Sequence, residues 1–301
     1  QQLEEEQQLE EEEEKSSKRA KMTLSTAAES TTKDELDPET SDAAPAGEDE
    51  DTMSYGVSRL LSLPCKFGRL TIAAGSVVDF CGSAIVNAAN TGCVGGGGVD
   101  GAISARGGYA LQDAREALPI VGKGRTRCEV GDAKTTIAGD LDAEWVIHAV
   151  GPNYHHYDDE DEADALLYSA YRAAMLEARD KQMESVGFSL LSAGIFRGSR
   201  QLEPVLRIGL TAVAANTYPE LKEAFLVAFT QREQATLEQA AAVLCPDPQR
   251  GFDWTAALAD MKSERLHKTH ALSLAELEAR HAAPPSPRAV APSSLSSCSP
   301  L

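Results

Sequence analysis

Apolar positions between residues 65 and 245 alternate between short runs and helical stripes. The clearest stripe holds Leu167, Tyr171, Ala174 and Ala178, whose spacing of three and four residues predicts an amphipathic helix. Short apolar runs predict six strands, at residues 70–73, 84–88, 134–137, 144–150, 186–191 and 224–229. Helical spacing predicts four helices, at residues 102–117, 164–179, 203–216 and 233–243. This alternation predicts an α/β domain whose sheet is covered by helices on both faces.

The segments on either side of residues 65–245 lack this periodicity. Residues 1–54 hold 18 acidic residues against 5 basic ones, which is −13 of the chain's net charge of −19. An acidic, glutamine-rich segment with few aromatic residues buries too little apolar surface to fold, so residues 1–60 are predicted to be a disordered acidic tail. Residues 246–301 end in a stretch rich in proline and serine, which predicts a weakly ordered to disordered tail.

Composition also bears on partners and on the cellular compartment. The chain has no basic face suited to phosphate backbones, so direct binding of duplex nucleic acid is not expected. It has no apolar run of membrane-spanning length, so a membrane is not expected as a partner. Its 6 cysteines are scattered without a metal-binding spacing, which favours a reduced protein of the cytoplasm or nucleus without structural zinc. The chain begins with Gln1, so organelle targeting by a preceding signal stays open.

A glycine-rich stretch, AIVNAANTGCVGGGGVDG at residues 84–101, follows a predicted strand directly. We call residues 87–98 of it the glycine loop. Glycines let the backbone approach a ligand closely, and the helix start beyond them supplies free N–H groups and the positive end of a dipole. The loop is therefore predicted to hold a phosphate or diphosphate. Asn87, Asn90 and Asp100 would add two amides and one carboxylate beside it.

Two other interpretations of the glycine loop compete with this one. A flexible turn before a helix is disfavoured, because four consecutive glycines carry a large entropic cost for a turn alone. Gly96, Gly98 and Gly101 also match the G-x-G-x-x-G fingerprint of dinucleotide-binding oxidoreductases. That fingerprint opens directly from a strand end, whereas about eight residues separate Val86 from Gly95 here.

A second loop, residues 192–198, also follows an apolar strand. Ligands of open α/β sheets bind beyond the carboxyl ends of the strands, so the two loops are expected to converge on one ligand. Gly194 would let backbone N–H groups approach a diphosphate. Phe196 would either stack beside part of that ligand or pack into the core.

Three motifs occur together in this order: the glycine-rich stretch, VIHAVGP at residues 146–152 and SLLSAGIFRG at residues 189–198. Over residues 67–244 the chain thereby resembles the macrodomain family of ADP-ribose-binding modules, in its hydrolytic branch. The resemblance implies a three-layer α/β/α fold with a mixed sheet of about six strands. It also implies that the chain acts without a cofactor or a metal.

The resemblance assigns roles to individual residues. Asn90 and Asp100 match the pair that acts at the distal ribose, and they are the predicted catalytic residues. The predicted ligand-binding residues are Ser76, Asn87, Gly95, Gly96, Gly97, Gly98, Val99, Ser192, Ala193, Gly194, Ile195, Phe196 and Arg197. Asp100 also precedes a predicted helix, where a carboxylate serves as a cap, so a structural role stays open for it.

The chain departs from the family pattern at two of these positions. Arg197 stands where the family has glycine, which changes the backbone of the second loop or brings a guanidinium near the phosphates. Ser76 stands where the family has the aspartate that accepts from the adenine amino group. Asp79, three residues further on, is the alternative acceptor.

These observations favour an enzyme that hydrolyses the ester linking ADP-ribose to an acidic side chain or a small acyl group. Two alternatives stay open. One is a reader that binds ADP-ribose without cutting it, and the other is a degenerate domain that acts as an interaction protein. The expected partner is ADP-ribose or an ADP-ribosylated protein, and the chain is expected to be a monomer.

Overall fold

Strands and helices alternate along residues 55–245, the part of the chain that the computed structural model describes. The strands are β1 (Ser58–Pro64), β2 (Arg69–Ala74), β3 (Ala84–Ala88), β4 (Ala133–Ile137), β5 (Trp145–Ala149), β6 (Ser185–Phe188) and β7 (Glu223–Ala228). The helices are α2 (Gly98–Glu116), α3 (Glu160–Asp180), α4 (Leu202–Ala215) and α5 (Gln231–Leu244), with the short 3-10 turns η1 (Val77–Asp79), η2 (Tyr154–His156) and η3 (Ile195–Arg197). This order confirms the predicted α/β alternation.

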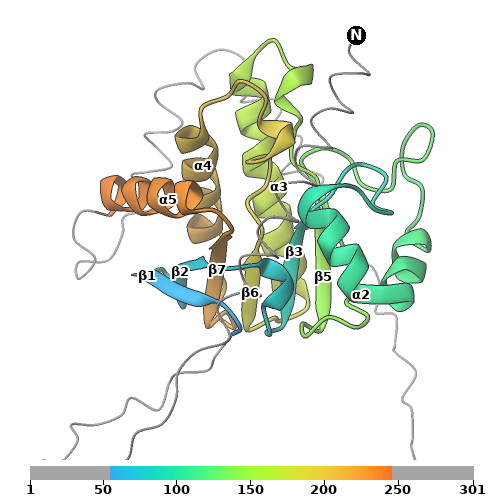
Figure 1. The fold of residues 1–301 in the computed structure, drawn as a ribbon, viewed down its shortest axis with the longest axis horizontal. Helices are drawn as coiled ribbons and strands as arrows, with labels where there is room; N and C mark the ends of the chain where they lie inside the picture. Colours follow the sequence, from blue (N-terminus) through green and yellow to red (C-terminus); the bar gives the residue numbers. More distant parts are fainter. Residues whose placement is uncertain (1–54, 246–301) are drawn as a thin grey trace, which may run out of the picture. The chain divides into compact units, whose positions relative to one another are not determined.

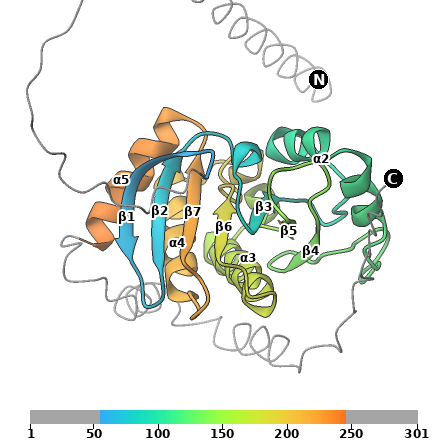
Figure 2. The ribbon, with the colours of Figure 1, turned by 90° about the horizontal axis from the view of Figure 1, so that it is seen from below.

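The strands form one mixed sheet in the order β1-β2-β7-β6-β3-β5-β4 (Figure 1; Figure 2 also labels β4). The five strands from β2 to β5 in this order pair in parallel, whereas β1 and β4 run antiparallel at the two edges. Every residue of the inner strand β7 is buried, as expected for a parallel strand covered on both faces.

Separate apolar cores lie on the two faces of the sheet. Helices α3, α4 and α5 pack on one face, where the buried side chains include Leu167, Val205 and Leu237. Helix α2 and turn η1 cover the other face, around Ile103 and Phe225. Figure 2 shows α2 and α3 on opposite sides of strands β3 and β5. The three layers are those that the family resemblance implies.

One strand was not predicted. β1 (Ser58–Pro64) begins within the stretch expected to be a disordered tail, and the Tyr55 ring just before it stacks on Phe80, so that expectation is wrong for residues 55–60. Most β1 positions are exposed and only Leu63 is buried, because β1 is an edge strand. Its leucines are interrupted by Ser62, so the sequence shows no continuous apolar run there. The rest of the predicted tails, residues 1–54 and 246–301, lies outside the described residues.

The observed helices begin earlier than predicted. Helix α3 begins at Glu160 rather than at residue 164, because the Asp159 side chain accepts a hydrogen bond of 2.9 Å from the Asp161 backbone N–H and caps the helix. Helix α2 begins at Gly98 and is broken at Gly108, whose φ of 65° is left-handed. This break turns the second half of α2 back toward the first.

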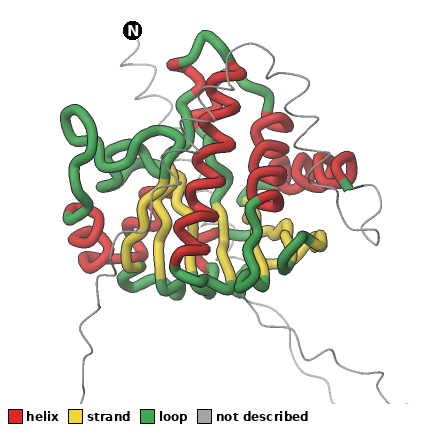
Figure 3. Tube along the Cα trace, turned by 180° about the vertical axis from the view of Figure 1, so that it is seen from behind, coloured by secondary structure: helices red, strands yellow, loops and turns green. Residues whose placement is uncertain are grey.

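The carboxyl ends of β3 and β6, which pair in parallel, lie at the same edge of the sheet. The glycine loop leaves β3 there, and the second loop follows β6. Figure 3 traces the long loops above the strands at this edge. The sheet topology therefore brings the two predicted ligand loops together. Within residues 55–245, none of the helices has the length and apolar character needed to cross a membrane.

Candidate functional site

A cleft of about 220 Å³ lies between the glycine loop and the second loop. Its walls come from the end of β3, the first turn of α2, the second residue after β5 and turn η3. The predicted site residues that line it are Asn90, Gly96, Gly97, Gly98, Val99, Asp100, Ser192, Gly194, Ile195 and Phe196. Two loops that lie about a hundred residues apart in the sequence thus form one site.

The glycine loop has a backbone that side chains would disturb. Gly95 and Gly98 have φ values of 139° and 58°, which favour glycine. A Cβ at Gly97 or Gly98 would meet nothing within 4 Å, so these glycines face open space. Helix α2 begins at Gly98 without a side-chain cap, so the backbone N–H groups of its first turn are free to meet an anion.

The second loop is held from behind. The Ser192 hydroxyl donates to the Pro152 carbonyl oxygen at 2.8 Å, and Ser192 itself has a left-handed φ of 54°. Gly194 opens turn η3, and a Cβ there would meet nothing within 4 Å. Ile195 is 78% exposed. The loop therefore offers a bare backbone and an exposed apolar side chain to the cleft.

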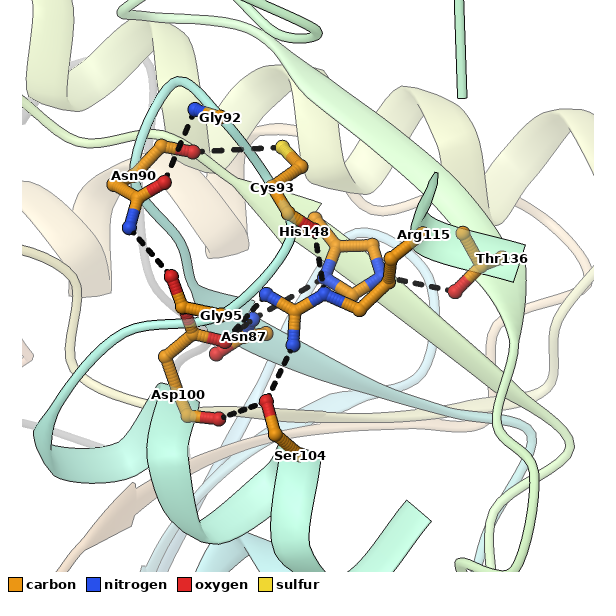
Figure 4. Close-up of polar contacts among 10 residues, drawn as sticks. All are labelled: Asn87, Asn90, Gly92, Cys93, Gly95, Asp100, Ser104, Arg115, Thr136 and His148. Carbon is orange, nitrogen blue, oxygen red and sulfur yellow. Dashed lines mark hydrogen bonds and ion pairs between the residues drawn. The ribbon is translucent and has the colours of Figure 1, made fainter. Parts of the chain in front are cut away.

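The Asp100 carboxylate is the charged group of the cleft, and it is 2% exposed (Figure 4). Its Oδ1 accepts from Arg115 Nη2 at 2.6 Å and from Asn87 Nδ2 at 2.8 Å. The Arg115 guanidinium neutralises this buried charge, which would otherwise carry a large desolvation cost. The negative charge of Asp100 is therefore compensated from the side that faces away from the cleft.

A chain of polar side chains continues behind Asp100. Asn87 Nδ2 also lies 3.2 Å from His148 Nδ1, and His148 Nε2 lies 2.9 Å from Thr136 Oγ1. Since Asn87 donates to Nδ1, His148 carries its proton on Nε2 and donates to Thr136. Burial, helped by the positive charge of Arg115, lowers the pKa of His148 to about 3. His148 is thus a neutral, hydrogen-bonded histidine of the core.

Two buried oxygens of this cluster have no hydrogen-bond partner within the described residues: Asp100 Oδ2 and Asn87 Oδ1. Asp100 Oδ2 lies beside Gly96, because a Cβ at Gly96 would stand 2.9 Å from it. Both Asp100 and Gly96 line the cleft. A buried carboxylate oxygen without a partner carries a substantial cost unless a ligand donates to it.

Asn90 lines the cleft but is held by its own loop. Its Nδ2 donates to the Gly95 carbonyl oxygen at 2.8 Å, and its Oδ1 accepts from the Gly92 backbone N–H at 3.0 Å. One amide hydrogen is left over for a ligand. The Asn90 side chain therefore shapes the glycine loop whether or not a ligand is bound.

Five predicted site residues do not line the cleft: Ser76, Asn87, Gly95, Ala193 and Arg197. Asn87 is fully buried beneath Asp100. Ser76 Oγ accepts from the Val78 backbone N–H at 3.3 Å and so closes its own turn. The Arg197 guanidinium donates to the Ala193 and Arg200 carbonyl oxygens, which ties the second loop to itself. Direct contact of these residues with a ligand stays a prediction.

Sequence reasoning missed two residues that the fold brings to this edge. Arg115 lies beneath Asp100, although it is fifteen residues further along the chain. Helical spacing could not predict this contact, because the helix is broken at Gly108. Phe229 directly follows β7 and is 76% exposed. Its neighbour Ala228 accepts from the Gly75 backbone N–H, so Phe229 and Ser76 follow adjacent strand ends. An apolar aromatic residue just past a strand end was the available signal.

Comparisons of the sequence and of the structure with known proteins all find macro domains. A family model described as Macro domain matches residues 86–202. A macro domain-containing protein of Cupriavidus necator is 36% identical over 160 residues, 53% of this chain and 90% of that protein. An O-acetyl-ADP-ribose deacetylase of Salmonella gallinarum is 39% identical over 128 residues, 42% of this chain and 69% of that protein. The structure of a mutant Oceanobacillus iheyensis macrodomain with ADPR has a TM-score of 0.55 at 25% identity, covering 62% of this chain and 99% of that one.

Proposed function

Since the chain belongs to the macro domain family, we propose that it binds ADP-ribose in this cleft and hydrolyses an ester at the distal ribose. The observation that carries the proposal is Asp100 Oδ2, a buried carboxylate oxygen without a partner among the described residues, beside Gly96 in the cleft wall. A ribose hydroxyl is a neutral donor of the right kind to satisfy it.

The rest of the ligand is accommodated by the two loops. The diphosphate would lie against the backbone N–H groups at the start of α2 and around Gly194, where no side chain intervenes. The adenine end would extend toward the ends of β2 and β7, where Phe229 offers an exposed ring for stacking. The deacetylase name of one relative supports a small acyl ester as one substrate class.

In the proposed reaction, water attacks the acyl carbon of the ester. The bond between that carbon and the distal-ribose oxygen breaks, the oxygen takes up a proton, and a carboxylic acid leaves. Asp100 and Asn90 orient the ribose and the water, and the bound diphosphate with its backbone cradle helps to position that water. Such a contribution is mostly positioning and electrostatic.

Calorimetry followed by a turnover assay tests this proposal. ADP-ribose should bind the full chain with a micromolar Kd, about −8 kcal/mol, and more tightly than AMP. O-acetyl-ADP-ribose or a peptide ADP-ribosylated on glutamate should then release free ADP-ribose. A flat titration with folded protein overturns the binding proposal. Tight binding without any turnover replaces the hydrolase with the reader.

A further inference from the structure

Arg115 is a fully buried arginine at the far end of the helix that begins at the cleft. The left-handed break at Gly108 folds the last turns of α2 back beneath the first. Figure 4 shows the guanidinium between the glycine loop and the first turn of α2. Among the described residues, Arg115 is the largest side chain that is completely buried. Burial of a guanidinium is costly unless all of its donors are used.

Each nitrogen of this guanidinium has a different partner. Nη2 donates to Asp100 Oδ1 at 2.6 Å and Nη1 donates to Ser104 Oγ at 2.7 Å. Nε donates to the carbonyl oxygen of Cys93, a residue held at a left-handed φ of 56°. Ser104 in turn donates to the Asp100 carbonyl oxygen at 2.8 Å. One side chain thus ties the turn after Asn90 to both the side chain and the backbone of Asp100.

These contacts fix the orientation of the Asp100 carboxylate. Arg115 and Asn87 both donate to one carboxylate oxygen, Oδ1. If the carboxylate turned away from them, both hydrogen bonds would be lost. The second oxygen, Oδ2, is thereby held beside Gly96. The same guanidinium, through Cys93, fixes the turn that carries Asn90.

We propose that Arg115 is a positioning residue that holds Asp100 and the Asn90 turn in the geometry required by the distal ribose. The inference rests on the proposed function, since it concerns the same cleft. Arg115 touches no ligand itself and acts through Asp100. Its planar fork of donors suits three acceptors in fixed directions, which a lysine ammonium does not reproduce at the same reach.

The test compares ADP-ribose with ADP, which lacks the distal ribose, by calorimetry on the full chain. Arg115→Lys keeps the charge and is expected to lower ADP-ribose affinity about tenfold while ADP affinity changes less than twofold. A merely structural role would lower both affinities alike. Arg106→Met is the matched control, because Arg106 lies on the same helix and pairs with Asp142 at the exposed surface. It should change neither affinity.

A double variant keeps the test decisive if the single change disturbs folding. Arg115→Met with Asp100→Asn removes both buried charges at once, so no unpaired charge remains. Because Arg115 acts through Asp100, the double variant should show the same ADP-ribose to ADP ratio as Asp100→Asn alone. Turnover of O-acetyl-ADP-ribose should fall in Arg115→Lys with a lower kcat and a higher KM, because this substrate carries the same distal ribose as ADP-ribose.

Outcomes of the test separate the inference from the proposed function. A parent chain that binds neither ADP-ribose nor ADP overturns the proposed function and this inference with it. A parent that binds both, with an Arg115→Lys variant that keeps the parent's ADP-ribose to ADP ratio, overturns only the inference. Effects of Arg115 and Asp100 that multiply in the double variant also overturn it, because they would be independent.

Discussion

The two ends of the sheet edge that carries the cleft are built in opposite ways. At the end of β3, Asp100 is buried and its charge is compensated by Arg115, with Asn87 and His148 behind it. At the ends of β2 and β7, Phe229 is 76% exposed and the Ser76 hydroxyl closes its own turn. One end is a packed, charged network, and the other is an open surface without a buried charge among these residues.

This difference predicts different tolerance to substitution. In the buried network the side chains hydrogen-bond to one another. Removal of one member leaves the donor or acceptor of another without a partner, at a cost of about 1–3 kcal/mol. At the exposed end, water satisfies whatever a substitution leaves behind. We therefore expect the Asp100 end to decide chemistry and recognition of the distal ribose. The Phe229 end should adjust affinity for the adenosine part alone.

The largest expected effect is the dependence of the free energy of unfolding on pH through the buried network. Because the pKa of His148 is about 3 when folded and 6.5 when unfolded, only the unfolded chain takes up this proton as the pH falls below about 6.5. Stability from this residue is therefore lost progressively between about pH 6.5 and pH 3. Urea unfolding should show a loss of about 2 kcal/mol between pH 7 and pH 5.

His148→Gln should remove this part of the pH dependence. The variant therefore separates the contribution of His148 from the contribution of the carboxylates. The control is His155→Gln, since His155 lies at an exposed position outside the network. It should leave the slope of unfolding free energy against pH as in the parent. A parent slope that survives in His148→Gln contradicts the assignment to the buried histidine.

Asp100→Ala gives the next largest effect and separates the two ends by chemistry. Removal of the carboxylate should lower hydrolysis of ADP-ribose esters at least tenfold, about 1.4 kcal/mol of barrier. Binding of free ADP should change much less, because ADP has no distal ribose. Steady-state kinetics and calorimetry on the same preparation measure both. Full turnover in a folded Asp100→Ala variant would show that the assigned role is wrong.

Phe229→Ala should act in the opposite manner. Loss of the exposed ring should weaken ADP-ribose and ADP by the same factor, about fivefold or 1 kcal/mol, because a base stacked on an aromatic ring contributes on that scale. Tyr109→Ala removes another exposed ring, on helix α2, and should change neither affinity. A larger loss for ADP-ribose than for ADP would place Phe229 at the wrong end of the ligand.

Ser76→Asp should have the smallest effect and sharpens the description of the open end. A carboxylate accepts from the adenine amino group more strongly than a hydroxyl, so ADP-ribose should bind about threefold more tightly than it does to the parent, about 0.7 kcal/mol. The preference for adenine over hypoxanthine should rise with it.

Asp79→Ala is the companion variant for Ser76→Asp. If Ser76→Asp weakens binding and Asp79→Ala abolishes the adenine preference, then Asp79 is the acceptor. If neither variant alters the ratio of adenine to hypoxanthine affinity, the base is not recognised at this end.

Much of the fold could be predicted from the sequence because the signals are local. Central strands are apolar at consecutive positions, as in β3, whose predicted bounds match the observed Ala84–Ala88. The apolar side chains of a helix recur every three or four residues within one continuous segment, so the helices were also predictable. β1 escaped prediction, because an edge strand exposes most of its side chains and is defined by its pairing with β2.

The candidate site divides in the same way. The sequence by itself determined which loops line the cleft, since glycines that follow a strand leave the backbone bare for a ligand wherever the chain folds. Only the tertiary structure decided that Asn87 lies beneath the cleft and that Arg115 compensates Asp100. A buried charge needs an opposite charge close to it in space, and any suitable residue that the fold brings within reach can supply that charge. No spacing along the chain records that choice.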